Sequence, residues 1–324
     1  MIMRILFIIT SVLILFLGSY IYAEGYTPPE PIEKEHFIFY LDNTKYLDMA
    51  DSLLLSTRAH LEKMLWDTID YKLNVYIIDD FNYFQKIIKG HFPDWGAAAA
   101  YPPQRLIAIK SPDKFNLNKS LSELLAHEYT HLALSHRTGL HDAPRWFEEG
   151  MAMLTSSEWS WSDNLEMSKT AVFGDFYNLN DIRNVNRFNE SQAHTAYSQS
   201  FLSVKYFFDN YGINGINIFL DSIASGATID NALLASTGAN YKEFNEEIKI
   251  DLRKRYNLIT LFADTMYLWL GLAIVVIIGF FLRYKKRREY YKKWEEEEKL
   301  HSTDFDYGDP EEPEKLDDDE PWRS

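Results

Sequence analysis

The feature that most constrains this chain of 324 residues is an uncharged stretch near its C-terminal end. Residues 265–282 carry no charged side chain. As a helix they would extend over about 27 Å, close to the thickness of the hydrocarbon core of a bilayer. Five Lys and Arg residues follow between residues 283 and 288, and such a basic flank stays on the cytoplasmic side. We therefore predict a transmembrane helix over residues 261–282, with the preceding chain outside the cytoplasm.

The N-terminal segment has the layout of a signal peptide. Arg4 precedes an apolar run over residues 5–17, and smaller, more polar residues follow up to Ala23. Both cleavage after Ala23 and retention as an N-terminal anchor are open for residues 1–23. In either case the prediction is a cell-membrane protein whose main domain is exported.

The segment after the membrane helix, residues 283–324, is first basic and then rich in Glu, Asp and Pro. Few of its residues could build a core, so we predict a disordered cytoplasmic tail whose part at residues 290–300 can continue the membrane helix. Two roles are open for this acidic tail: a solvated segment, or a docking site for a cytoplasmic partner.

Composition excludes several classes of function. The formal net charge is -15, and the middle of the chain has no basic patch, so nucleic acid is not an expected partner. Cysteine is absent, which excludes disulfides, thiol nucleophiles and Cys-ligated zinc. Histidine and carboxylate side chains are then the strong metal ligands that the chain can offer.

The exported part is predicted to have an α+β fold. Residues 24–118 read as a small N-terminal α/β subdomain, and residues 119–258 as a mainly helical subdomain, because apolar residues there recur at three and four apart. The expected elements are a linker over residues 24–35, strands over 36–41, 72–78 and 106–109, and helices over 45–66, 120–135, 143–156 and within 191–260.

The helical part contains the motif His127-Glu128-x-x-His131. On a helix, side chains four residues apart lie one turn above the other, so the two imidazoles could bind one cation. Glu128 would lie beside the metal, where it could take a proton from water. Burying these three polar residues without a partner would be costly, which favours a metal site.

A catalytic zinc site has three protein ligands and one open position, so a third ligand is expected nearby. Pro144 starts a second predicted helix, and a short Gly-containing segment before it lets this helix fold back beside the first. Its carboxylates, Glu148 and Glu149, are the candidates to complete the site.

The complete pattern resembles the gluzincin metallopeptidases, in particular the peptidase MA-like family. Seventeen residues separate His131 from Glu149, which begins a Glu-Gly-x-Ala motif after an aromatic pair. The resemblance implies a zincin-like catalytic domain with one Zn²⁺ per chain, bound by His127, His131 and Glu149. It also implies hydrolysis of a peptide or protein substrate with Glu128 as the general base.

The same resemblance covers about residues 95–255 and assigns a role to Tyr197, whose hydroxyl would stabilise the oxyanion of the transition state. The alternative for Tyr197 is a core tyrosine with a hydrogen-bonded hydroxyl. His194 and His136 are interpreted as ordinary histidines, because three ligands are already assigned.

Related aminopeptidases hold the free amino group of the substrate with a glutamate on a strand before the zinc helix. Here the comparable residues, 96–101, contain no carboxylate. We therefore expect an endopeptidase that binds its substrate along this edge strand. Three alternatives stay open: an aminopeptidase, a hydrolase acting on another bond, and a non-catalytic or regulatory membrane protein that retains the zincin fold.

Overall fold

The computed structural model describes residues 26–89, 96–139 and 141–300, so the predicted signal peptide and the end of the acidic tail lie outside the described residues. Contacts divide the chain into two units that meet between residues 264 and 265. The first unit contains the sheet and the helices α2 to α10, and the second contains α11.

The N-terminal part of the first unit is built on a five-stranded mixed sheet with the order β1-β2-β3-β5-β4. The inner strands β2, β3 and β5 are parallel, and the two outer strands pair antiparallel to their neighbours. The strands are β1 (Pro31–Glu33), β2 (Phe37–Leu41), β3 (Leu73–Ile78), β4 (Ala98–Tyr101) and β5 (Leu106–Lys110).

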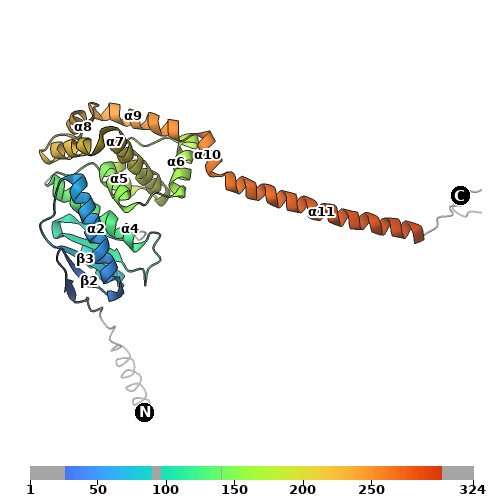
Figure 1. The fold of residues 1–324 in the computed structure, drawn as a ribbon, viewed down its shortest axis with the longest axis horizontal. Helices are drawn as coiled ribbons and strands as arrows, with labels where there is room; N and C mark the ends of the chain where they lie inside the picture. Colours follow the sequence, from blue (N-terminus) through green and yellow to red (C-terminus); the bar gives the residue numbers. More distant parts are fainter. Residues whose placement is uncertain (1–25, 90–95, 140, 301–324) are drawn as a thin grey trace, which may run out of the picture. The chain divides into compact units, whose positions relative to one another are not determined.

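Helices cover both faces of this sheet because its strands are apolar on both sides. Phe37, Phe39 and Ile107 belong to the main core under α2 (Leu47–Leu65) and α4 (Leu121–Thr138), which lie on one face (Figure 1). On the other face, Phe84 of α3 (Phe81–Ile88) packs with Leu106 of β5 in a smaller cluster. The predicted small α/β subdomain is therefore present, with β4 as an edge strand.

The rest of the first unit is helical, as predicted. A break in α7 occurs at Gly212, whose φ of 65° and ψ of -171° lie outside the helical region. The helices that follow α4 are α5 (Arg145–Ser156), α6 (Trp161–Phe173), α7 (Glu190–Ala224), α8 (Ile229–Thr237), α9 (Tyr241–Arg255) and α10 (Leu258–Asp264).

A cluster of aromatic rings holds α5 in place. Trp146 and Phe147, the aromatic pair of the motif, lie with their ring centroids 6.5 and 4.9 Å from that of Phe219 on α7. Phe244 of α9 lies 5.8 Å from Trp146. All four side chains are almost completely buried, so α5 is fixed between α4 and α7 by large apolar contacts.

The structure corrects the sequence-based assignment in three places. Residues 31–33, expected within a linker, form β1 because their backbone pairs with β2. Helices α3 and α6 were not predicted. Helix α3 has only eight residues. Helix α6 begins with a capping box in which Asp163 accepts a hydrogen bond from the N–H of Ser160, a signal that was present in the sequence.

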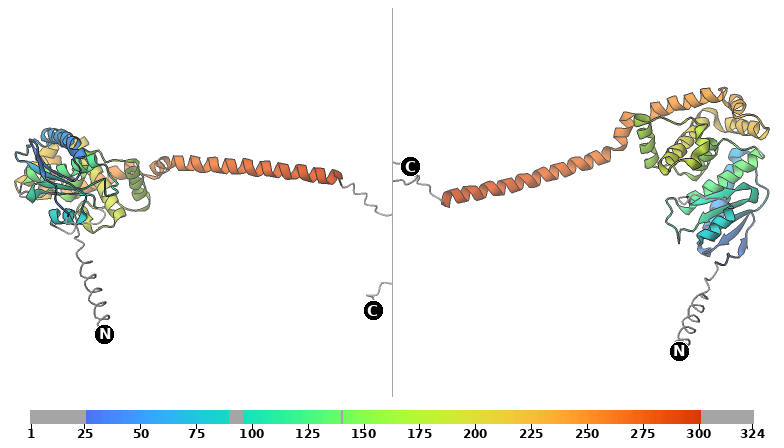
Figure 2. Two further views of the ribbon diagram at one scale, coloured as in Figure 1. Left: turned by 90° about the horizontal axis from the view of Figure 1, so that it is seen from below. Right: turned by 180° about the vertical axis from the view of Figure 1, so that it is seen from behind.

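In the described part of the second unit the chain forms helix α11 (Met266–Leu300), which Figure 2 shows as uninterrupted. Its residues 266–299 are long and apolar enough to cross a membrane by length and composition, with a mean hydropathy of 2.2 in the most apolar window. Residues 283–289 were expected in the disordered tail, and residues 290–300 as a segment that can continue the helix. All of residues 283–300 belong to α11, because Lys, Arg and Glu are good helix formers.

Candidate metal centre

Helix α4 presents His127 and His131 on one face. The helix begins after Ser120, whose hydroxyl accepts a hydrogen bond from the backbone N–H of Glu123 at 3.2 Å. The Glu123 carboxylate accepts one in return from the Ser120 N–H at 2.7 Å. This reciprocal cap defines the first turn of the helix. The two histidines follow one turn apart, with ring centroids separated by 5.0 Å.

Helix α5 brings the carboxylate of Glu149 to these histidines. Its Oε2 lies 3.4 Å from Nε2 of His127 and 3.8 Å from Nε2 of His131, and the side chain is 1% exposed. One ligand atom from each of the three residues lies within 4.8 Å of the others. The structure thus brings together the three residues predicted as ligands, and their two nitrogens and one oxygen could hold a metal ion.

Gly150 allows α5 to approach α7 closely. A Cβ at this position would lie 2.3 Å from the carbonyl oxygen of Ser200 and 2.5 Å from Cγ2 of Val204. Both distances are well below van der Waals contact, so a side chain would push α5 away from α7. Close packing of α5 against α7 therefore requires a glycine after Glu149. This packing helps to position the carboxylate of Glu149.

Glu158 orients the ring of His127, a contact that the sequence analysis did not predict. Its Oε1 lies 2.7 Å from Nδ1 of His127 and accepts a hydrogen bond from Ser156 Oγ at 2.7 Å, while Oε2 pairs with Lys119. A proton on Nδ1 that is donated to Glu158 makes Nε2, the nitrogen that faces Glu149, the one that could bind a metal ion. The signal for this residue was weak, because Glu158 lies beyond the end of α5 and in no recognised motif.

The metal-binding group carries an uneven set of charges. Burial by itself would lower the pKa of His127, but the hydrogen bonds to Glu149 and Glu158 raise it to about 10. Burial lowers the pKa of His131 to about 3. For Glu149, burial would raise the pKa, but Arg145 and the two imidazoles hold it well below its usual range. A metal ion would therefore take the place of the proton on His127.

Glu128 lies next to this group and is 7% exposed. Burial raises its pKa to about 7, although the charge of His127 opposes the shift. The backbone N–H of Ala100 on β4 donates a hydrogen bond to the carboxylate. A carboxylate that titrates near neutral pH can both accept and return a proton under physiological conditions.

Two further polar side chains border the group. A terminal nitrogen of Arg145 lies 2.5 Å from Oε1 of Glu149, so this carboxylate has one oxygen toward the histidines and the other toward a guanidinium. Tyr197 of α7 forms a hydrogen bond with Arg145. Burial is the main cause that raises the pKa of its hydroxyl, and the charges of Glu149 and Glu128 raise it further, so the Tyr197 hydroxyl keeps its proton.

The two histidines interpreted as ordinary and the other candidate carboxylate, Glu148, each have a partner of their own. Nε2 of His194 lies 3.1 Å from Asp163, and Nδ1 of His136 lies 2.6 Å from Asp67. Glu148 points toward Arg145 at 3.7 Å. None of the three belongs to the metal-binding group found among the described residues.

The free edge of β4 runs past Glu128. The N–H of Lys110 on β5 donates to the carbonyl of Ala97 at 2.9 Å, so these two residues form a hydrogen-bonded pair. Because such pairs alternate along an antiparallel ladder, the N–H and C=O groups of Ala98 and Ala100 point away from β5. The N–H of Ala100 binds Glu128, and the other outward groups of this strand could pair with a further extended strand.

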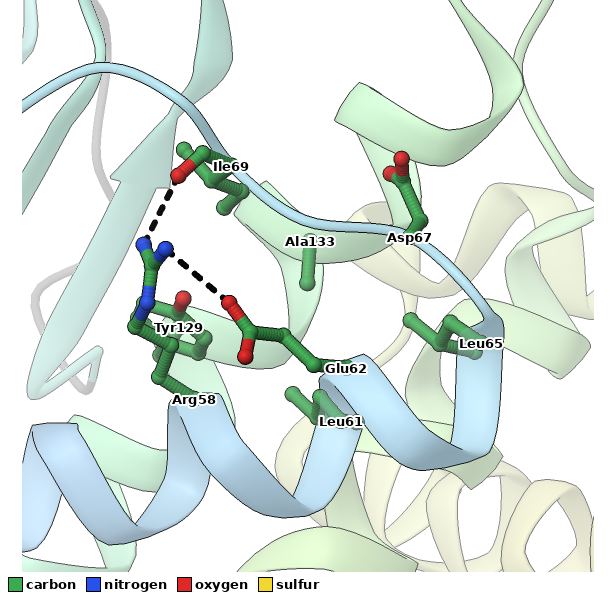
Figure 3. Close-up of a pocket in the computed structure, with 8 residues that line it drawn as sticks. All are labelled: Arg58, Leu61, Glu62, Leu65, Asp67, Ile69, Tyr129 and Ala133. Carbon is green, nitrogen blue, oxygen red and sulfur yellow. Dashed lines mark hydrogen bonds and ion pairs between the residues drawn. The ribbon is translucent and has the colours of Figure 1, made fainter.

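A small cavity lies behind α4, on the side of Tyr129 and Ala133 (Figure 3). Its volume is about 10 Å³, enough for one water molecule at most. Arg58 fills its polar side by donating to the carbonyl of Ile69 at 2.8 Å and pairing with Glu62 at 2.9 Å. A larger hollow of about 430 Å³ is lined by α2, α4 and the end of α5 but by none of the three candidate ligands. Neither space contains the candidate centre.

A comparison of the sequence with models of protein families finds a match to one family. The model of the peptidase MA superfamily matches residues 59–253, a region that contains α4, α5 and α7 and thus all the residues of the candidate centre. A search of curated proteins finds no match to the chain.

Proposed function

The chain belongs to the peptidase MA superfamily, and on this premise we propose that it is a membrane-anchored zinc endopeptidase. One observation carries the proposal: Nε2 of His127, Nε2 of His131 and Oε2 of Glu149 converge beside the buried carboxylate of Glu128. The family supports a peptidase. The metal, the residue roles and the type of cleavage are our inference.

Zinc is the metal that fits this donor set. Two imidazoles and one carboxylate are ligands of catalytic zinc sites, which leave one position open, whereas structural zinc sites use four protein ligands. Glu158 supports the assignment, because metal-bound histidines donate their other ring N–H to a carboxylate or a carbonyl.

When bound, zinc would act as a Lewis acid that polarises the scissile carbonyl and makes water more acidic. Glu128 accepts the proton of the attacking water and transfers it to the nitrogen of the leaving amine. Its pKa of about 7 without the metal suits both transfers, since neither protonation state is strongly favoured at neutral pH. The hydrogen bond from Ala100 holds the carboxylate in place between transfers.

We expect Tyr197 and Arg145 to stabilise the negative charge that develops on the carbonyl oxygen. Both are proton donors at neutral pH, because burial raises the pKa of Tyr197 and the carboxylate of Glu149 raises that of Arg145 against the effect of burial. We expect Tyr197→Phe to lower kcat by about 100- to 1000-fold, the range for loss of one oxyanion donor. Zinc content should stay unchanged, which separates this role from a structural one.

The deciding experiment uses the full chain in detergent and an unfolded protein as substrate. We expect Glu128→Gln to retain zinc and to lose about 100- to 10,000-fold in kcat, because only the proton transfer is removed. Glu149→Ala should lose both zinc and activity, and Glu30→Gln, a change at an exposed carboxylate, should lose neither. Equal activity of wild type and Glu128→Gln would refute the mechanism.

The type of cleavage is tested with one peptide in two forms, with a free and with an acetylated N-terminus. An endopeptidase that binds its substrate along Ala98 and Ala100 should cut both at the same internal bonds. Stepwise release of single residues from the free form alone would instead show an aminopeptidase.

The same chain offers a test of its orientation in the membrane, because it contains no cysteine. We propose that the peptidase unit lies outside the cytoplasm and that the segment after α11 lies inside. A cysteine introduced at Lys63 should react with a membrane-impermeant maleimide on intact cells, whereas one at Ser302 should react only after lysis. The reverse pattern would overturn the proposed orientation.

A further inference from the structure

Apolar side chains are exposed on the part of the first unit that immediately precedes α11. In α10, Leu258 is 67% and Ile259 is 79% exposed, and Phe173 at the end of α6 is 80% exposed. Single exposed apolar residues are common, but three large ones on two helices in contact indicate a surface that binds something. We refer to Phe173, Leu258 and Ile259 as the α6–α10 surface.

Hydrogen bonds fix how these two helices run. The hydroxyl of Tyr256, just before α10, donates to Asn164 at 3.3 Å. Farther along both helices, Ser168 Oγ donates to Asp264 at 3.0 Å. The two helices therefore run in the same direction. Leu258 and Ile259 lie at the start of α10, whereas Phe173 at the end of α6 lies toward the other end of α10, from which the chain continues.

The helix that follows in the chain points to the lipid bilayer as the partner that covers this surface. Only Thr265 separates α10 from the first residue of α11, the helix long and apolar enough to cross a membrane. If α11 is the membrane anchor, α10 cannot be more than a few residues from the bilayer. Lys169 and Lys254 are exposed, and each stands four residues before a member of this surface, Phe173 and Leu258. Such basic side chains could pair with lipid phosphates, as in helices that lie in the membrane interface.

We propose that the α6–α10 surface is inserted into the headgroup region of the lipid bilayer and holds the peptidase unit against the membrane. The inference rests on the proposed membrane anchor but not on the zinc chemistry. It would restrict the candidate centre to substrates near the membrane surface, because the unit could not move freely about the end of its anchor.

The absence of cysteine allows a direct test by single-cysteine labelling of the full chain. Bimane is attached at Ile259→Cys, Phe173→Cys and two controls, in vesicles of phosphatidylcholine and phosphatidylglycerol with or without brominated acyl chains. The negative control is Leu55→Cys, an apolar residue that is 39% exposed on α2, and the positive control is Ile277→Cys within α11.

We expect brominated lipids to quench the labels at 259, 173 and 277 but not at 55. Quenching at 277 alone would overturn the proposal and leave the anchor intact. A blue-shifted label at 259 without quenching would also overturn it, because protein, such as a second copy of the chain, would then cover the surface. An unquenched label at 277 would refute the anchor and the proposal together. None of these readouts depends on peptidase activity.

Discussion

At the scale of single residues, the most informative contact is the one between His127 and Glu158. A histidine can offer either ring nitrogen to a metal, and the hydrogen bond at Nδ1 decides in favour of Nε2. Lys119 and Ser156 hold Glu158 in turn, so the orientation of the first ligand depends on a chain of contacts outside the motif.

This contact gives a prediction for Glu158→Gln. The amide keeps the shape of the side chain but no longer offers a charged acceptor, so we expect zinc affinity to fall by about 10- to 100-fold. Competition with a chromophoric chelator measures the change, and Glu30→Gln serves as the matched control. Unchanged affinity in Glu158→Gln would show that Glu158 does not position His127.

A second prediction concerns the pH dependence of metal binding. The pKa of His127 is raised to about 10, so without metal this imidazole is protonated at neutral pH, and a metal ion must displace the proton. Apparent affinity should therefore rise by about tenfold per pH unit between about pH 7.5 and 9. Calorimetry in buffers of different ionisation enthalpy should show release of at least one proton, and binding without proton release would contradict the assigned charges.

At the scale of elements, the site depends on how closely α5 lies against α7. We expect Gly150→Ala to destabilise the protein by about 1–3 kcal/mol, because its methyl group would overlap the backbone of Ser200. Zinc affinity should fall as well, since Glu149 would move with α5.

Thermal unfolding with and without zinc measures both effects. Gly174→Ala is the control, because a Cβ there would approach Thr170 O only to 3.4 Å and the backbone φ is -133°. Equal melting temperatures for wild type and Gly150→Ala would show that the close approach is not needed.

The sequence was sufficient to predict the helices that carry the site, because the residues of the motif are close together in the sequence. His127, Glu128 and His131 are related by the helical repeat, and Glu149 follows at a spacing that resembles a known family. The structure brings the three candidate ligands together as expected. The family match agrees with the resemblance.

Contacts between distant segments could not be predicted in this way. Glu158 reaches His127 across 31 residues, and Arg145 reaches Tyr197 from another helix. The strand β1 was missed because three residues give no periodic signal, and its conformation depends on pairing with β2. Helix α3 was missed for a similar reason, since eight residues show little more than two turns.

At the scale of the whole molecule, a peptidase-family unit is combined, within the described residues, with one helix that could cross a membrane. A lone membrane helix can hold an enzyme near a surface without fixing its orientation. The α6–α10 surface would supply that second constraint, because a further contact with the bilayer would limit how the unit turns about its anchor.

The three-ligand metal centre is tested most directly by anomalous X-ray diffraction at the zinc absorption edge from crystals of the full chain. We expect one peak per chain, at about 2.0–2.2 Å from Nε2 of His127, Nε2 of His131 and an oxygen of Glu149, with a fourth position not filled by protein. No peak at this position, or coordination by a fourth protein side chain, would contradict a catalytic zinc site.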